Sequence, residues 1–68
     1  MTNDQVIDAL QHLIGSRYVP AVKGYISELT GRARVVGPHE AHSREMDLER
    51  IAVQVVGDEG EIDGFTFG

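Results

Sequence analysis

The strongest constraint on this chain is residues 37–48, a segment with neither helical nor strand periodicity in a sequence of only 68 residues. Connections of this length without regular structure are uncommon in compact domains, and those that occur usually carry function. Gly37-Pro38 begins the segment, and the proline removes a backbone donor and fixes φ. We therefore expect an exposed loop at 37–48, with the folded body built from the residues on either side.

Before this loop, apolar residues recur at the three- and four-residue steps of a helix. The first stripe predicts a short N-terminal helix within residues 1–14, with a cap at residues 2–4 and a stop at Gly15. The second stripe predicts the main helix between Pro20, which suits a first helical turn, and Gly31. The apolar positions are Val6, Ile7, Leu10, Leu13 and Ile14 in the first stripe, and Val22, Tyr25, Ile26 and Leu29 in the second.

Around and after the loop the pattern is that of strands. Residues 33–36 are a short β-prone run, residues 51–55 alternate between apolar and other side chains, and residues 61–67 follow a glycine-rich turn. In the last run Ile62 lies on one parity and the two phenylalanines on the other, so we expect a bulge at Gly64 where the strand changes face. Helices followed by strands predict one α+β domain spanning residues 1–68.

Composition limits the possible partners. The net charge of −5 and pI near 4.9 oppose phosphate neutralisation, so we expect no nucleic-acid partner. With no cysteine, the chain has neither a disulfide nor a thiolate metal ligand. No apolar run reaches the roughly 18 residues of a membrane span, and the first residues lack signal-peptide features. We expect no membrane partner and a soluble chain, either cytoplasmic or secreted after removal of a leader.

Charge is unevenly distributed along the chain. Basic residues gather at 16–36, whereas residues 40–63 are strongly acidic. An acidic surface can attract a basic partner, and improved solubility is the alternative interpretation.

A metal site is one hypothesis for the loop, because His39, Glu40 and His42 are close in sequence. The two histidines are three positions apart in an extended segment, whereas a zinc helix spaces them by four. Solvated loop histidines are the simpler interpretation, and His12 reads as a histidine on the flank of the first helix. We expect no metal and no cofactor.

Catalytic chemistry is poorly supported. The glycines at 57, 60 and 64 do not match a phosphate-binding spacing. The serines are Ser16, Ser27 and Ser43, and adjacent residues such as His42 and Ser43 point in opposite directions on an extended chain. A domain this small also offers little concave volume in which to desolvate carboxylates. We expect no enzyme activity.

The loop and its flanks nevertheless have a recognisable order. Residues 34–38 read Arg-Val-Val-Gly-Pro, residues 49–51 read Glu-Arg-Ile, and the last strand ends in Gly68. With Leu13-Ile14-Gly15 upstream, this order over residues 13–68 resembles the potato type I serine proteinase inhibitors, which include chymotrypsin inhibitor 2, and above all their short bacterial and fungal elastase-inhibitor relatives. The place of their binding loop is taken here by Ala41, His42, Ser43, Arg44, Glu45 and Met46.

The resemblance implies a small mixed sheet with a main helix packed on it, and an exposed binding loop between the first two strands. It implies reversible, substrate-like inhibition of a trypsin- or subtilisin-like serine proteinase. Arg44 falls at the primary specificity position and Glu45 just after the scissile bond. An arginine there favours a trypsin-like target, because a desolvated guanidinium–carboxylate pair is strong.

The resemblance also implies a support for the loop. Ser43 and Glu45 match the loop side chains that are held from the next strand, and Arg50 and Gly68 match supporting positions. Ala52 stands where a second supporting arginine is expected, which implies a less firmly held loop.

Other departures from the family pattern are Met46 in place of an aromatic residue, Asp47 and Leu48 in place of Arg and an apolar or Pro residue, and Phe67 in place of a cysteine. The alternatives to inhibition are a non-inhibitory interaction module on the same scaffold and the loop metal site. The natural target and the oligomeric state stay open.

Overall fold

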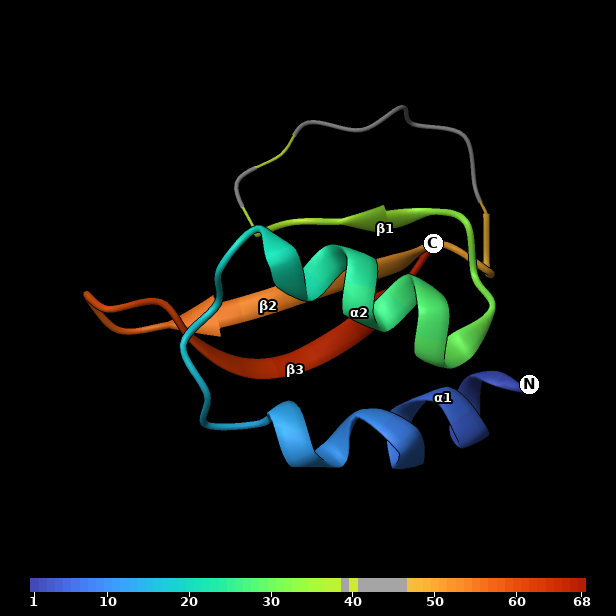
Figure 1. The fold of residues 1–68 in the computed structure, drawn as a ribbon, viewed down its shortest axis with the longest axis horizontal. Helices are drawn as coiled ribbons and strands as arrows, with labels where there is room; N and C mark the ends of the chain where they lie inside the picture. The colour runs from blue at the N-terminus through green and yellow to red at the C-terminus, as the bar shows by residue number, and fades with distance from the viewer. Residues whose placement is uncertain (39, 41–46) are drawn as a thin grey trace.

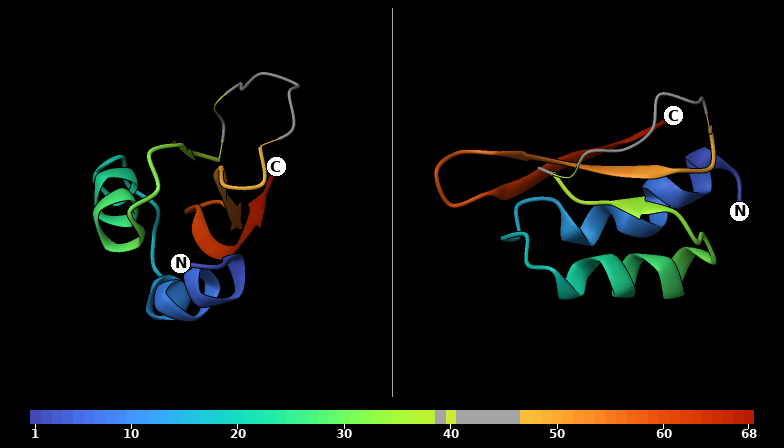
Figure 2. Two further views of the ribbon diagram at one scale, coloured as in Figure 1. Left: turned by 90° about the vertical axis from the view of Figure 1, so that its right-hand side faces the viewer. Right: turned by 90° about the horizontal axis from the view of Figure 1, so that it is seen from above.

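The computed structural model describes residues 1–38, 40 and 47–68, and within them it is a small α+β domain. Both helices lie on one face of a three-stranded mixed sheet (Figures 1 and 2). None of the described helices is long and apolar enough to cross a membrane. The elements are the helices α1 (Asn3–Leu10) and α2 (Ala21–Thr30), the 3₁₀ turn η1 (Gln11–Leu13), and the strands β1 (Val35–Val36), β2 (Ile51–Val56) and β3 (Glu61–Phe67).

Helix α1 begins as predicted and ends early. Thr2 forms a capping box with Gln5, in which the Thr2 Oγ1 accepts from the Gln5 N–H and the Gln5 side chain accepts from the Thr2 N–H. The α-helix ends at Leu10, not at the end of the 1–14 stripe, and the chain tightens into η1. The cause is tertiary, because residues 15–18 pair with β3 through hydrogen bonds that include Gly15 N–H to the Ile62 carbonyl at 2.8 Å.

Helix α2 has the predicted ends. Pro20 occupies its N-cap, and Gly31 ends it in the left-handed conformation with φ 72°. The Gly31 N–H donates to the Ser27 carbonyl at 2.9 Å, so the last turn is closed by a backbone bond.

The sheet has the order β1-β2-β3, with β1 parallel to β2 and β2 antiparallel to β3. A parallel pair needs a long return connection, and residues 37–50 form it. They leave β1 at one end of the pair and enter β2 at the other (Figure 1).

The predicted bulge in β3 is present, but its effect is the opposite of a change of face. Gly64 pairs with Gln54 and Ile62 with Val55, which leaves Asp63 as the extra residue. The bulge restores the alternation, so Ile62 joins Phe65 and Phe67 on the core face. The fully buried side chains come from both helices and both long strands: Val6, Leu10, Ile26, Ile51, Val53 and Ile62.

Candidate functional site

The predicted binding residues Ala41, His42, Ser43, Arg44, Glu45 and Met46 lie outside the described residues, as does His39. The site is therefore built from the two ends of the connection. We call residues 37, 38 and 40 the incoming stem, and residues 47–50 the outgoing stem.

The incoming stem is held to α2 through Glu40. Its carboxylate accepts hydrogen bonds from the Lys23 Nζ at 2.7 and 2.8 Å and from the Gly37 N–H at 2.7 Å. The Glu40 N–H in turn donates to the Gly37 carbonyl at 3.3 Å. Glu40 thus closes a tight turn with Gly37 and links this turn to Lys23 of α2.

Two side chains approach closely to Gly37, the first residue of this turn. A Cβ on Gly37 would lie 2.5 Å from the Glu40 Oε1 and 2.7 Å from the Tyr18 hydroxyl. Both distances are far below van der Waals contact, so any side chain here must displace the carboxylate or the phenol. A shallow hollow of about 370 Å³ lies beside this stem, lined by Tyr18, Pro20, Lys23, Gly37, Pro38 and Glu40.

The charges of the incoming stem stabilise each other. The hydrogen bond from Lys23, followed by that from the Gly37 N–H, lowers the pKa of Glu40. The same hydrogen bond to Glu40 raises the pKa of Lys23. Burial is the main cause that raises the pKa of Tyr18. At neutral pH the stem therefore carries a complete ion pair next to an uncharged phenol.

The outgoing stem is a turn organised by Asp47. Its Oδ1 accepts from the Glu49 N–H at 3.0 Å, and its carbonyl accepts from the Arg50 N–H at 2.9 Å. Its Oδ2 pairs with the Arg34 Nη1 at 3.0 Å, which links the turn to the residue before β1. The Ile51 N–H donates to the Arg34 carbonyl at 3.0 Å, so β2 begins directly beside Arg34.

Arg50 and Gly68, two of the predicted supporting residues, lie together. The Arg50 side chain is only 5% exposed, and its Nε donates to the Gly68 carbonyl at 3.1 Å. The Gly68 N–H returns a bond to the Arg50 carbonyl at 3.3 Å. Glu45, the third predicted supporting residue, lies outside the described residues. The two bonds between Arg50 and Gly68 anchor the residue just before β2 to the last residue of the chain.

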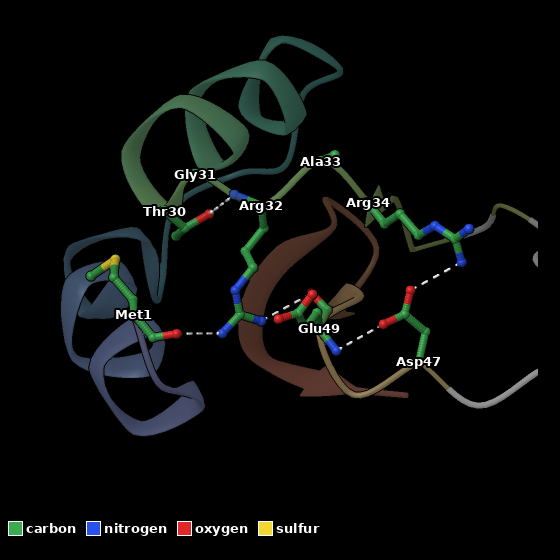
Figure 3. Close-up of a pocket in the computed structure, with 8 residues that line it drawn as sticks. All are labelled: Met1, Thr30, Gly31, Arg32, Ala33, Arg34, Asp47 and Glu49. Atoms are coloured by element: carbon green, nitrogen blue, oxygen red, sulfur yellow. Dashed lines mark hydrogen bonds and ion pairs between the residues drawn. The ribbon is translucent and has the colours of Figure 1, made fainter.

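Arg32 is a residue that sequence reasoning did not single out. It is 9% exposed, and its guanidinium donates to the carbonyls of Glu49 at 3.0 Å and Met1 at 2.8 Å (Figure 3). A third bond reaches the Asn3 Oδ1 at 3.0 Å, and the guanidinium lies 5.9 Å from the Phe67 ring centroid. Its only sequence signal is its place after the helix-ending Gly31, which does not predict burial.

A polar hollow of about 420 Å³ lies around these groups (Figure 3). Every buried side-chain polar atom among the described residues has a hydrogen-bond partner, so the hollow holds no unsatisfied group aimed at a ligand. It is lined by Met1, Thr30, Gly31, Arg32, Ala33, Arg34, Asp47 and Glu49.

The remaining sequence candidates have structural roles where they are described. Ser27 donates its hydroxyl to the Arg32 carbonyl at 2.7 Å, and the Ser16 carbonyl accepts from Ile62. The ring nitrogen of His12 lies 2.5 Å from the Tyr25 hydroxyl, in an edge-on ring contact between the helices. Glu40 is committed to Lys23, and no group of three metal-binding side chains occurs in the described part of the chain.

Comparison of this chain with protein-family models, with curated proteins and with solved structures finds no match.

Proposed function

We propose that this chain is a reversible, substrate-like inhibitor of a serine proteinase, acting through the segment 41–46 with Arg44 as its primary specificity residue. The observation that carries the proposal is the anchoring of both stems. Glu40 is bonded to Lys23 on one side, and Arg50 is bonded to Gly68 on the other. A segment whose ends are held loses little conformational entropy on binding, and its cut ends stay close enough to rejoin.

The charge of Arg44 selects the class of target. A trypsin-like proteinase has a carboxylate at the bottom of its main pocket, and a desolvated guanidinium–carboxylate pair is among the strongest side-chain interactions. Glu45 would follow the scissile bond, next in sequence to residues that lead into the outgoing stem. Subtilisin-like proteinases are the second class to test.

The experiment is a titration of trypsin and subtilisin with the intact chain, combined with mass spectrometry of the mixture. We expect stoichiometric loss of trypsin activity, with slow and reversible cleavage confined to the Arg44–Glu45 bond. Rapid, complete cleavage at that bond with no inhibition would contradict the proposal, because it would make the loop an ordinary substrate.

Arg44→Ala tests the specificity residue. We expect it to weaken trypsin inhibition at least about 30-fold, as truncation of a central interface arginine commonly costs about 2 kcal/mol or more. The matched control is Arg17→Ala, an exposed arginine beside the start of β3. Equal inhibition by both variants would refute the role of Arg44. The absence of any interaction with either proteinase would favour a non-inhibitory interaction module.

A further inference from the structure

Residues at the start of the chain contact the outgoing stem directly. The Asn3 Nδ2 donates to the Leu48 carbonyl at 3.1 Å, a contact between residues 45 positions apart. Arg32 adds a second link between the same two segments, because its guanidinium donates to Met1 and Asn3 on one side and to the Glu49 carbonyl on the other. Three segments that are distant in sequence therefore meet at one buried guanidinium.

The chemistry of this junction makes it rigid. A guanidinium presents its N–H donors in a fixed planar fork, so its acceptors must occupy fixed places. All three acceptors of Arg32 are neutral: two backbone carbonyls and one amide oxygen. Since a buried charge is tolerated only when its donors are satisfied, displacing one acceptor disfavours the whole arrangement.

Side-chain packing does little to fix the backbone carbonyls of Leu48 and Glu49 in the outgoing stem. Leu48 is 60% exposed and Glu49 is also exposed, so side-chain packing contributes little at either residue. The bonds from Asn3 and Arg32 reach the backbone that directly follows residue 47.

We propose that Met1, Asn3 and Arg32 form a strap that positions the outgoing stem and thereby sets how firmly the inhibitory segment is held. Asn3 and Arg32 are positioning residues in this scheme, and the inference rests on the proposed function. It gives helix α1 a role in the site, although no residue of α1 lies near the connection in sequence.

Asn3 allows a clean test, because it is the first residue of α1 and alanine there does not weaken the helix. Asn3→Ala removes both bonds of the Asn3 side chain, the one to the Leu48 carbonyl and the one from the Arg32 guanidinium. Asn3→Asp keeps an acceptor for Arg32 but loses the donor to Leu48. The matched control is Val55→Ala, which removes core packing at the end of β2 away from the outgoing stem and no bond of Met1, Asn3 or Arg32.

The first readout is amide hydrogen exchange at Glu49 and Arg50, whose N–H groups bond within the stem. The second is the rate of trypsin cleavage after Arg44, and urea unfolding reports global stability. We expect Asn3→Ala to raise both rates about tenfold, as the loss of one or two hydrogen bonds implies. Asn3→Asp should give a smaller increase, and Val55→Ala should leave both rates unchanged at an equal or larger loss of stability.

Two results would overturn the strap. One is an equal acceleration in Asn3→Ala and Val55→Ala at matched stability, which would make Asn3 merely structural. The other is unchanged exchange in Asn3→Ala. If the parent chain does not inhibit trypsin, the proposed function fails, and the exchange measurement by itself still decides whether the strap positions the stem.

Discussion

The two stems of the 37–50 connection are held by different physical means. The incoming stem depends on an ion pair at the surface, in which the side chains of Lys23 and Glu40 are 34% and 48% exposed. The outgoing stem also has a surface ion pair, between Asp47 and Arg34, but it is held in addition by the buried guanidinium of Arg32 and its neutral acceptors. Surface ion pairs are weakened by solvent and salt, whereas buried hydrogen bonds are not easily replaced by water.

The difference predicts that the two stems contribute differently to stability and to its dependence on pH and salt. The incoming stem combines a weak electrostatic contact with a close approach of the Glu40 and Tyr18 side chains to Gly37. The outgoing stem combines many hydrogen bonds with little packing of Leu48. We expect the outgoing side to dominate stability and the incoming side to respond to pH and salt.

The largest expected effect is that of Arg32→Ala. It removes three part-buried hydrogen bonds from a charged donor that joins three segments, so we expect a loss of about 2–4 kcal/mol in urea unfolding. Arg32→Lys should recover less than half, because an ammonium cannot reproduce the planar fork. The control Arg17→Ala should stay within about 0.5 kcal/mol of the parent. A similarly small effect of Arg32→Ala would remove the contrast between the stems.

The next effect is steric. Gly37→Ala places a Cβ against the Glu40 carboxylate and the Tyr18 hydroxyl, so we expect a loss of about 1–2 kcal/mol in the same unfolding assay. The matched control is Gly24→Ala in the exposed middle of α2, where a Cβ meets nothing within 4 Å. That substitution should raise stability by up to about 1 kcal/mol, because alanine is the better helix former. Two changes of the same sign would argue against the close approach at Gly37.

The smallest effect is the pH dependence of the incoming stem. Because Lys23 lowers the pKa of Glu40 below 4.5, this carboxylate stabilises the fold above about pH 4.5 and stops doing so as the pH falls through its folded-state pKa. The raised pKa of Lys23 acts in the other direction, stabilising the fold below about pH 10.5 and ceasing to do so as the pH rises further.

Urea unfolding of the parent and of Glu40→Gln from about pH 3 to pH 7 tests this. The difference should be present at pH 7, shrink in high salt and vanish at the acidic end. A difference independent of pH would mean that Glu40 acts only through the shape of its turn.

Much of the local structure could be predicted from particular residues. Gly31 ends α2, Thr2 caps α1, and the two β-prone runs beside the 57–60 turn become β2 and β3. These features depend on neighbours in the chain: a left-handed glycine, a reciprocal cap and an alternation of two. The bulge beside Gly64 was also indicated by the sequence, because Ile62 and the two phenylalanines lie at positions of opposite parity.

The early end of α1 could not be predicted in the same way. Leu13 and Ile14 continue the helical stripe, yet the α-helix ends at Leu10, and the chain turns so that residues 15–18 form backbone hydrogen bonds beside β3. The burial of Arg32 and the contact of Asn3 with Leu48 are of the same kind, since a charged residue and an amide carry no periodic signal.

For the candidate site, the sequence alone named the segment 41–46 and its flanks, Arg50 and Gly68 included. Short-range patterns decided where most of the elements begin and end, with the end of α1 as the exception, because caps, turns and alternation act over a few residues. Only the tertiary structure decided that the start of the chain, the end of α2 and the outgoing stem meet at Arg32. A buried guanidinium takes whichever carbonyls the packing brings to it, and that choice is made by contacts between segments far apart in the chain.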